Sequence, residues 1–298
     1  MTRIAFATCS PRQAVWEDDL PAAELLIEAG VAVEFVAWDD PEADWTAFDR
    51  VIVRSAGDYD LRLEQFLSWA DEVGPGRLRN GPETIRWNSD RRYLAELDGG
   101  GLPVPPTLLV APGGRIPELD GEFVIKPVTG AGVRDTGRFG NDSLAAALDL
   151  LEKLGEQDEV AMVQPYLPEI EVNGETAVVL FGGRVEYALR KRAFLPPGSV
   201  APAGETGVAA AMSEDDPIRL TEASPAELEL AEKAIAWIAA RLGQMPLFAR
   251  VDMVLTGSGQ PVLMEVELID PCLYFSQAAS LETPGAQAFA AAVIAELG

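Results

Sequence analysis

Residues 249–271 read ARVDMVLTGSGQPVLMEVELIDP, which is the most informative stretch of the chain. Two strand-like runs flank a Gly-rich turn, so we predict a β-hairpin here. Asp252 lies on the first run, and Glu265 and Glu267 alternate on one face of the second. Carboxylate oxygens grouped in this way suit Mg²⁺ bound to nucleotide phosphates. The alternative is an ordinary solvated strand face, although the apolar neighbours would make an unpaired charge costly without a cation.

Composition narrows the classes of protein that fit. The chain has 298 residues, of which 48% are hydrophobic, enough for a large core divided among two or three lobes. Its formal net charge of −25 argues against nucleic acid and anionic membranes as partners, because both attract clustered Lys and Arg. The sequence has no membrane-spanning apolar run and no signal-peptide core, so we expect a cytoplasmic protein.

The chain contains no histidine, which excludes a Ser-His-Asp triad, a His-ligated zinc site and a His general base. Its two cysteines, Cys9 and Cys272, lie far apart and match neither a metal-ligand spacing nor a disulfide framework. Phosphoryl transfer suits the remaining residue types, because it depends on positioned cations and carboxylate-bound metal more than on proton transfer.

Residues 3–55 alternate strand, helix, strand and strand patterns, which predicts a small α/β lobe with parallel strands. In such sheets, ligands bind beyond the carboxyl ends of the strands. The candidate substrate-binding residues in the two loops concerned are Glu17, Asp18, Arg54, Ser55, Asp58 and Tyr59. For Arg54 and Asp58, a local surface ion pair is the alternative.

The next segment reads as a loop at residues 74–84 and a helix at 88–97 that Asn88 or Ser89 can cap. Gly and Pro residues at 98–107 then mark a lobe boundary.

A strand pattern at residues 122–128 carries Lys126 near its end, directly before a loop with four glycines that ends at Gly140. Glycines let backbone amides approach phosphate oxygens closely, and Arg134 or Arg138 can add charge-assisted hydrogen bonds. A flexible surface loop without this role is the alternative.

The rest of the chain predicts mixed helices and strands. We expect a helix at 142–156, a strand at 160–166, two strands within 167–191 joined by an FGGR turn, and a serine-capped helix at 224–243. Residues 196–217 form a long Pro- and Gly-rich loop of the kind that often carries function.

Seven motifs in order resemble the ATP-grasp ligases, particularly the glutathione-synthetase-like branch, over about residues 88–275. These motifs are FVIKP, the Gly-containing loop, MVQPYLPEI, NGETAVVLFGG, GETG, ARVD and LMEVE. The resemblance implies an α/β and α+β protein with the ATP-grasp fold, in which two lobes clamp ATP. It divides the chain into an N-terminal α/β substrate-side domain (1–88), a central lobe with a Gly-rich lid (89–167) and a C-terminal lobe with the metal site (168–298).

The resemblance also implies a role for individual residues in a reaction that activates a carboxylate as an acyl phosphate. Asp252, Glu265 and Glu267 match the Mg²⁺ ligands, and Arg250 matches the arginine that stabilises the acyl-phosphate oxyanion. Lys126 matches the lysine that holds the nucleotide phosphates. The other implied nucleotide-binding residues are Thr129, Gly130 and Gly132 in the lid (Thr129–Gly140), Gln164, Tyr166 and Leu167 at the adenine hinge, and Glu175 at the ribose.

Two departures from the family pattern change the charge of the site. Arg91 stands where the family carries a second phosphate-binding lysine, which keeps the charge but changes the donor geometry. Glu267 stands where many relatives carry asparagine, so the site is more acidic. Lys191, also a candidate for nucleotide binding, or Arg190 would compensate the extra acid.

The motifs EDDLP (17–21) and VRSAGDY (53–59) narrow the resemblance to the ATP-grasp proteins grouped with a D-cycloserine-forming ligase. That resemblance implies intramolecular cyclisation of O-ureido-D-serine, although Gly57 stands where the group commonly carries Trp. The partner would be a small amino-acid-like carboxylate, and a homodimer is left open. The alternatives are a ligase joining two substrates, a kinase, and a non-catalytic nucleotide-binding module.

Overall fold

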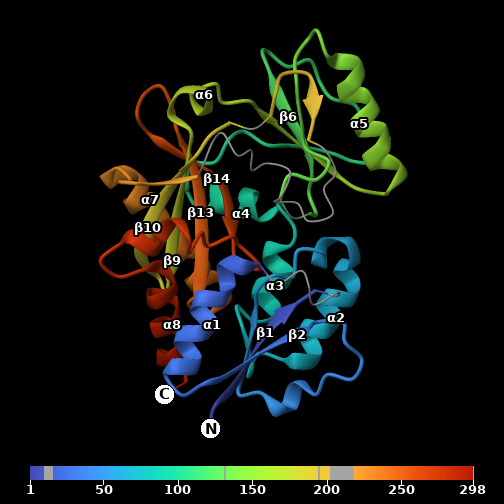
Figure 1. Ribbon diagram of the computed structural model, residues 1–298. Helices are drawn as coiled ribbons and strands as arrows, with labels where there is room; N and C mark the ends of the chain where they lie inside the picture. Colours follow the sequence, from blue (N-terminus) through green and yellow to red (C-terminus); the bar gives the residue numbers. More distant parts are fainter. Residues whose placement is uncertain (10–15, 131, 194, 202–217, 298) are drawn as a thin grey trace.

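The computed structural model describes residues 1–9, 16–130, 132–193, 195–201 and 218–297, which form three lobes, each built on one sheet (Figure 1). One sheet is parallel and the other two are antiparallel, in agreement with the mixed α/β and α+β expectation. Within these residues, no helix is both long enough and apolar enough to cross a membrane.

The N-terminal lobe is a parallel sheet in the order β2-β1-β3-β4. Its strands are β1 (Arg3–Thr8), β2 (Ala32–Ala37), β3 (Arg50–Val53) and β4 (Leu78–Arg79), with helices α1 (Leu20–Glu28) and α2 (Leu63–Val73) and 3₁₀ turns at Glu17–Asp19, Trp45–Ala47 and Tyr59–Arg62. The predicted parallel α/β lobe is confirmed, so the carboxyl ends of β1 and β3 lie at the same edge of the sheet.

The segment between the first two sheets differs from the sequence prediction. Helix α3 (Pro82–Asn88) begins inside the predicted loop, and the next helix, α4 (Tyr93–Gly99), starts later than expected, with Arg92 at its N-cap position. Pro82 explains the early start, because the first turn of a helix needs no N–H from proline. Neither Asn88 nor Ser89 caps α4, so this prediction was wrong.

The central lobe is an antiparallel sheet in the order β11-β7-β6-β8-β5. Its elements are β5 (Leu108–Val110), β6 (Phe123–Pro127), β7 (Gly137–Phe139), β8 (Ala161–Pro165), β11 (Ser199–Val200) and α5 (Leu144–Glu156). Phe123 and Ile125 pack in the core that includes α5, so Val124 and Lys126 lie on the opposite face. The predicted loop at 196–217 contributes β11, while its remainder from residue 202, including GETG, lies outside the described residues.

The C-terminal lobe is an antiparallel sheet in the order β12-β10-β9-β13-β14. Its elements are α6 (Glu169–Asn173), β9 (Glu175–Phe181), β10 (Arg184–Lys191), β12 (Arg219–Thr221), α7 (Pro225–Leu242), β13 (Phe248–Leu255), β14 (Pro261–Glu267), a 3₁₀ turn at Gln277–Ser280 and α8 (Gly285–Ala295). Both predicted hairpins are confirmed, and Ser224 caps α7 in a capping box with Glu227. The start of the predicted strand pair is wrong, because residues 169–173 form α6 before β9 begins.

Hydrophobic contacts join the lobes. Tyr93, Leu94 and Leu97 of α4 pack in the same core as α7 and the strands β9, β13 and β14. Helix α8 packs against α1, and the two run side by side in Figure 1. The C-terminal helix thus ties the last lobe to the first, whereas the division at residues 88 and 167 stays a prediction.

Two asparagines at the start and end of the α3 segment, Asn80 and Asn88, hydrogen-bond to the backbone around the ends of β13 and β14. Asn80 is buried, and its side-chain nitrogen donates to Phe248 O and Leu268 O while its oxygen accepts from Leu247 N, each at 2.8 Å. The Asn88 side chain similarly donates to a carbonyl of β14 at 2.7 Å and accepts from Leu268 N at 2.8 Å. These bonds satisfy backbone groups at the end of the strand that carries the acidic residues.

Candidate active site

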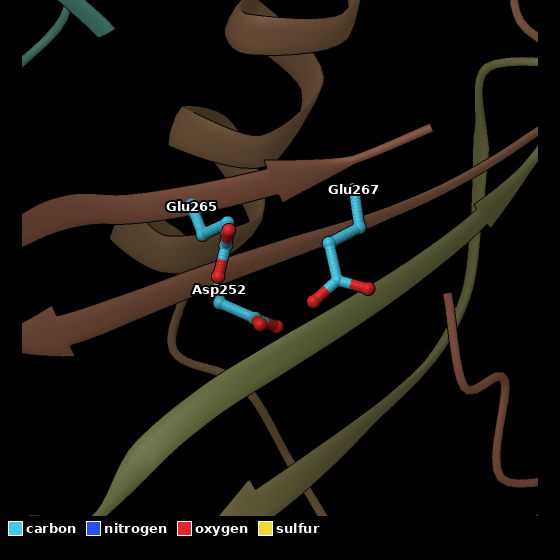
Figure 2. Close-up of side chains that lie close together, drawn as sticks. All are labelled: Asp252, Glu265 and Glu267. Carbon is cyan, nitrogen blue, oxygen red and sulfur yellow. The ribbon is translucent and has the colours of Figure 1, made fainter. Parts of the chain in front are cut away.

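The β13–β14 hairpin brings the three predicted metal ligands together. Its register pairs Asp252 with Glu265 and Arg250 with Glu267, so all four side chains project from one face. One oxygen each from Asp252, Glu265 and Glu267 can be chosen so that all lie within 4.8 Å of one another. Figure 2 shows the three carboxylates pointing toward one another above the strands. Three hard oxygen ligands at this spacing fit a divalent cation such as Mg²⁺.

Cationic side chains surround this cluster. Arg250 donates to Asp252 at 3.0 Å and also pairs with Glu267. Lys191 Nζ lies 2.8 Å from Asp252 Oδ2 and also pairs with Glu175. From the sequence, either Lys191 or Arg190 is expected to compensate the negative charge of the cluster. Lys191 does so, whereas Arg190 lies 4.0 Å from Glu227.

Arg91 connects the cluster to the central lobe. It lies 4% exposed after α3, and its Nε donates to Glu265 Oε1 at 3.2 Å. Its terminal nitrogens donate to Pro127 O at 3.0 Å and Gly132 O at 3.3 Å. A Cβ at Gly130 would meet Arg91 Nη1 at 3.3 Å, so glycine allows the loop to pack closely over the guanidinium.

Burial and neighbouring charges shift the pKa values of the cavity carboxylates in different directions. Burial raises the pKa of Glu267 to about 7; the Arg250 charge offsets part of this rise, and repulsion from Glu265 and Asp252 adds to it. Burial also raises the pKa of Glu175. Burial opposes ionisation of Asp252 and Glu265 too, but nearby Arg and Lys side chains outweigh it and lower both pKa values. The cluster therefore combines firmly ionised carboxylates with one that is easily protonated.

A cavity of about 680 Å³ lies against this cluster and is lined by residues of all three lobes. The sequence candidates that line it are Tyr59, Arg91, Lys126, Gly130, Gly132, Gln164, Tyr166, Leu167, Glu175, Lys191, Arg250, Asp252, Glu265 and Glu267. Lys126 is buried within it, and desolvation lowers its pKa despite the neighbouring Glu265 charge. Opposite charges therefore meet in one cavity, as binding of an anionic nucleotide with a metal requires.

The three hinge candidates lie at the end of β8 and just beyond it. Gln164 donates to Thr107 Oγ1 at 2.9 Å, and Tyr166 N donates to Glu122 O at 2.9 Å. Thr129 does not line the cavity; its hydroxyl donates to Glu159 instead.

Of the six predicted substrate-binding residues, only Tyr59 lines the cavity. Arg54 is fully buried: its Nε lies 2.9 Å from Asp19 Oδ1, and its Nη1 lies 2.9 Å from Pro271 O. Asp58 pairs with Arg62. For Arg54 and Asp58 the structure thus favours the ion-pair alternative, and in Arg54 the pair is buried.

The other three predicted substrate contacts are also engaged within the protein or exposed. Ser55 Oγ donates to Asp19 Oδ2 at 2.7 Å. Asp18 accepts hydrogen bonds from Phe275 N and Ser276 N, and Glu17 is exposed. Direct substrate contact by these three residues stays a prediction that the cavity lining does not support.

Sequence reasoning missed several residues that line the cavity, among them Trp16, Asn88, Asp270, Cys272 and Tyr274. Three of them follow β14 in the segment after LMEVE. One signal in the sequence could have pointed to this segment. The motif LIDP, just beyond the hairpin, places an acidic residue shortly after the end of a strand.

Comparison with known proteins places this site in a family. Residues 4–80 match the family model of the N-terminal domain of D-cycloserine synthetase DcsG. The chain is 31% identical over 267 residues to the cycloserine biosynthesis protein DcsG of Streptomyces lavendulae, covering 85% of this chain and 86% of that protein. The chain belongs to the DcsG group of ATP-grasp ligases.

Solved structures agree with this membership. The crystal structure of D-cycloserine synthetase DcsG matches with a TM-score of 0.85 and 28% identity, over 99% of this chain and 100% of that chain. The D-alanine–D-alanine ligase of Bacillus anthracis complexed with ATP matches with a TM-score of 0.64 and 15% identity over 100% of both chains, a likeness of fold. The ATP-grasp fold expected from the sequence is confirmed, and this DcsG-like chain is an ATP-dependent ligase.

Proposed function

We propose that this ligase activates the carboxylate of a small amino acid with ATP and Mg²⁺, and that it cyclises O-ureido-D-serine to D-cycloserine. The observation that carries the proposal is the similarity to the cycloserine biosynthesis protein along 85% of the chain. The cavity supports it, because cations and carboxylates from three lobes converge there.

In this proposal, Lys126 and Arg91 hold the phosphates of ATP, and Asp252, Glu265 and Glu267 hold Mg²⁺. The donor set fits the metal because its oxygens lie within 4.8 Å of one another. The bound metal would neutralise phosphate charge as the phosphoryl group is transferred. Lys126, Arg91 and the three carboxylates line one cavity, so phosphates and metal would be held close together there.

The ring closes in two bond-forming steps, and a hydrolytic step follows. A carboxylate oxygen of the substrate attacks the γ-phosphorus, ADP leaves, and an acyl phosphate forms. The ureido nitrogen bonded to oxygen then attacks the acyl carbon, loses its proton, and expels phosphate to close the ring. Arg250 lies beside the metal ligands and can stabilise the oxyanion in this second step.

The ring nitrogen of D-cycloserine bears hydrogen, whereas the ring formed from the ureido group still bears a carbamoyl group. Water must therefore attack that carbamoyl carbon and release the ring nitrogen together with carbamate, which gives ammonia and CO₂. Because nucleophile and electrophile belong to one molecule, the reaction needs no second amino acid.

The test is to incubate the protein with Mg-ATP and O-ureido-D-serine, with no other amine, and to measure ADP, phosphate, ammonia and D-cycloserine. We expect all four products, and much less ADP with O-ureido-L-serine. If ADP forms only when a second amino acid is added, and a linear dipeptide results, the protein is a two-substrate ligase instead. If no carboxylate stimulates ADP release, a non-catalytic nucleotide-binding role replaces the proposal.

A further inference from the structure

Asp270 differs from the other acidic residues of the cavity. The cavity-lining carboxylates of Glu175, Asp252, Glu265 and Glu267 all form ion pairs with Arg or Lys. Within the described part of the chain, Asp270 forms none. Its cavity-facing charge is also not accounted for by the metal or nucleotide roles proposed above.

Two backbone amides hold the Asp270 side chain. Ser55 N donates to Oδ1 at 2.9 Å and Ala56 N donates to Oδ2 at 2.6 Å. Both amides can point at one carboxylate because Ser55 has a φ of +63°, in the left-handed region. Each oxygen accepts one of these bonds, so both keep acceptor capacity for a further donor.

A buried ion pair fixes this arrangement. Asp19 accepts from the Arg54 guanidinium and from Ser55 Oγ, and both residues of the Arg54–Asp19 pair are fully buried. Arg54 also donates to Pro271 O at 2.9 Å, next to Asp270 in the chain. Arg54, Ser55 and Asp19 do not line the cavity themselves, and their contacts make them positioning residues for Asp270.

The environment of Asp270 leaves its negative charge poorly compensated. Burial raises its pKa to about 6, and the charge of Asp19 adds to this effect, while Arg54 offsets it in part. A cation arriving from the cavity would lower the free energy of the ionised carboxylate. The side chain thus has the hydrogen-bonding capacity and the unmet charge that an ammonium group requires.

We propose that Asp270 binds the α-ammonium group of the amino-acid substrate. This inference rests on the proposed function, because it assumes that the carboxylate activated by ATP belongs to an amino acid. Tyr59 lines the same cavity, and its hydroxyl makes no hydrogen bond within the described residues, so it is a second candidate to contact the polar groups of the amino acid. Asp270 follows the proposed metal ligand Glu267 by three residues, so one chain segment would orient both the α-ammonium group and the carboxylate on the same carbon.

Steady-state kinetics with an amino acid and its deamino analogue test this assignment. The pair is O-ureido-D-serine and 3-(ureidooxy)propanoate, or any amino acid that stimulates ADP release and its deamino counterpart. We expect the unaltered protein to prefer the ammonium-bearing compound by roughly 10- to 100-fold in kcat/KM, as a charge-assisted hydrogen bond provides. In Asp270→Asn the preference should fall to about threefold or less, with the KM for ATP changed by less than about twofold.

The comparison separates recognition from structural damage. A variant that merely distorts the cavity slows both compounds by the same factor and keeps the preference, and this result would overturn the proposal. Asp270→Glu keeps the charge and should retain a preference for the ammonium-bearing compound. Asp44→Asn, which removes an exposed carboxylate at the 3₁₀ turn Trp45–Ala47, should behave as the unaltered protein.

The two proposals fail in different ways. ADP release with an amino acid, together with an unchanged preference in Asp270→Asn, overturns only the role of Asp270. Absence of ADP release with every amino acid overturns the proposed function, and the Asp270 assignment falls with it.

Discussion

Arg250 and Asp252 lie two residues apart on β13, and two parallel hydrogen bonds join their side chains on one face of the strand. Nε donates to Oδ1 and Nη2 donates to Oδ2, both at 3.0 Å. The same guanidinium pairs with Glu267. Arg250 therefore neutralises two of the three carboxylates that we propose to bind Mg²⁺, and a metal entering the cluster competes with it for them.

Removing any one carboxylate should impair the metal site. We expect Asp252→Asn, Glu265→Gln and Glu267→Gln each to lower Mg²⁺-dependent ADP release by roughly 100-fold, because each removes a ligand to the ion that neutralises phosphate charge. Rates measured over a range of Mg²⁺ concentrations check this. Glu229→Gln on the exposed face of α7 is the matched control. Near-normal rates in all three variants would disprove the metal assignment.

Lys126 and Arg250 should affect different kinetic constants. Lys126→Ala should weaken ATP binding by roughly 10- to 100-fold, because it removes a buried cation from the nucleotide cavity. Arg250→Ala should instead lower kcat by roughly 100-fold or more, if its charge stabilises an oxyanion that exists only during reaction. Calorimetric ATP titration and steady-state kinetics separate the two. An effect of Arg250→Ala confined to the KM for ATP would make it a ground-state nucleotide contact.

The loop next to the residues that we propose to bind phosphate should respond to nucleotide. Residues 132–140 should gain hydrogen-exchange protection when Mg-ATP binds, because their amides gain phosphate partners and Arg91, which bonds Gly132 O, becomes fixed. Mass spectrometry of deuterium uptake with and without a non-hydrolysable ATP analogue measures this. Peptides from α2 provide the internal control. Identical uptake in both states would argue against a lid.

Asp270 should make stability depend on pH. Its pKa rises from an ordinary 3.8 to about 6 on folding, so the folded state binds the proton more tightly than the unfolded state. The free energy of unfolding should therefore fall as pH rises from about 4 to about 6, by at most about 3 kcal/mol. Asp270→Asn removes this contribution. Its thermal midpoint should rise relative to the unaltered protein over that interval, and a constant difference would contradict the shift.

Asn80 should be important for stability. Its side chain satisfies three backbone groups around the ends of β13 and β14, and its φ is +53°. Asn80→Gly keeps a residue suited to that φ but removes the three bonds, so we expect a loss of roughly 3 kcal/mol. Asn80→Ala adds backbone strain and should lose more. Denaturant unfolding measures both, and a loss under about 1 kcal/mol would show that water replaces the side chain.

The sequence could predict features that depend on the alternation of side chains along a strand. Side chains on a strand alternate between faces, so the letters DMV and MEVE already place Asp252, Glu265 and Glu267 on one face of a hairpin. The same rule places Lys126 on the face of β6 opposite the core. The parallel lobe followed from strand and helix periodicity. The errors at α3 and α6 came from short helices, whose signals are weak because they contain few turns.

By itself, the sequence determined the architecture, the absence of histidine chemistry and the three acidic residues that form the candidate metal site, because these depend on residue type and local periodicity. The tertiary structure alone decided which distant charges meet. Arg54 looked like a substrate contact, but packing places it against Asp19, while Asp270 faces the cavity. Such pairings depend on how segments far apart in the chain pack and exclude water, which local sequence patterns do not encode.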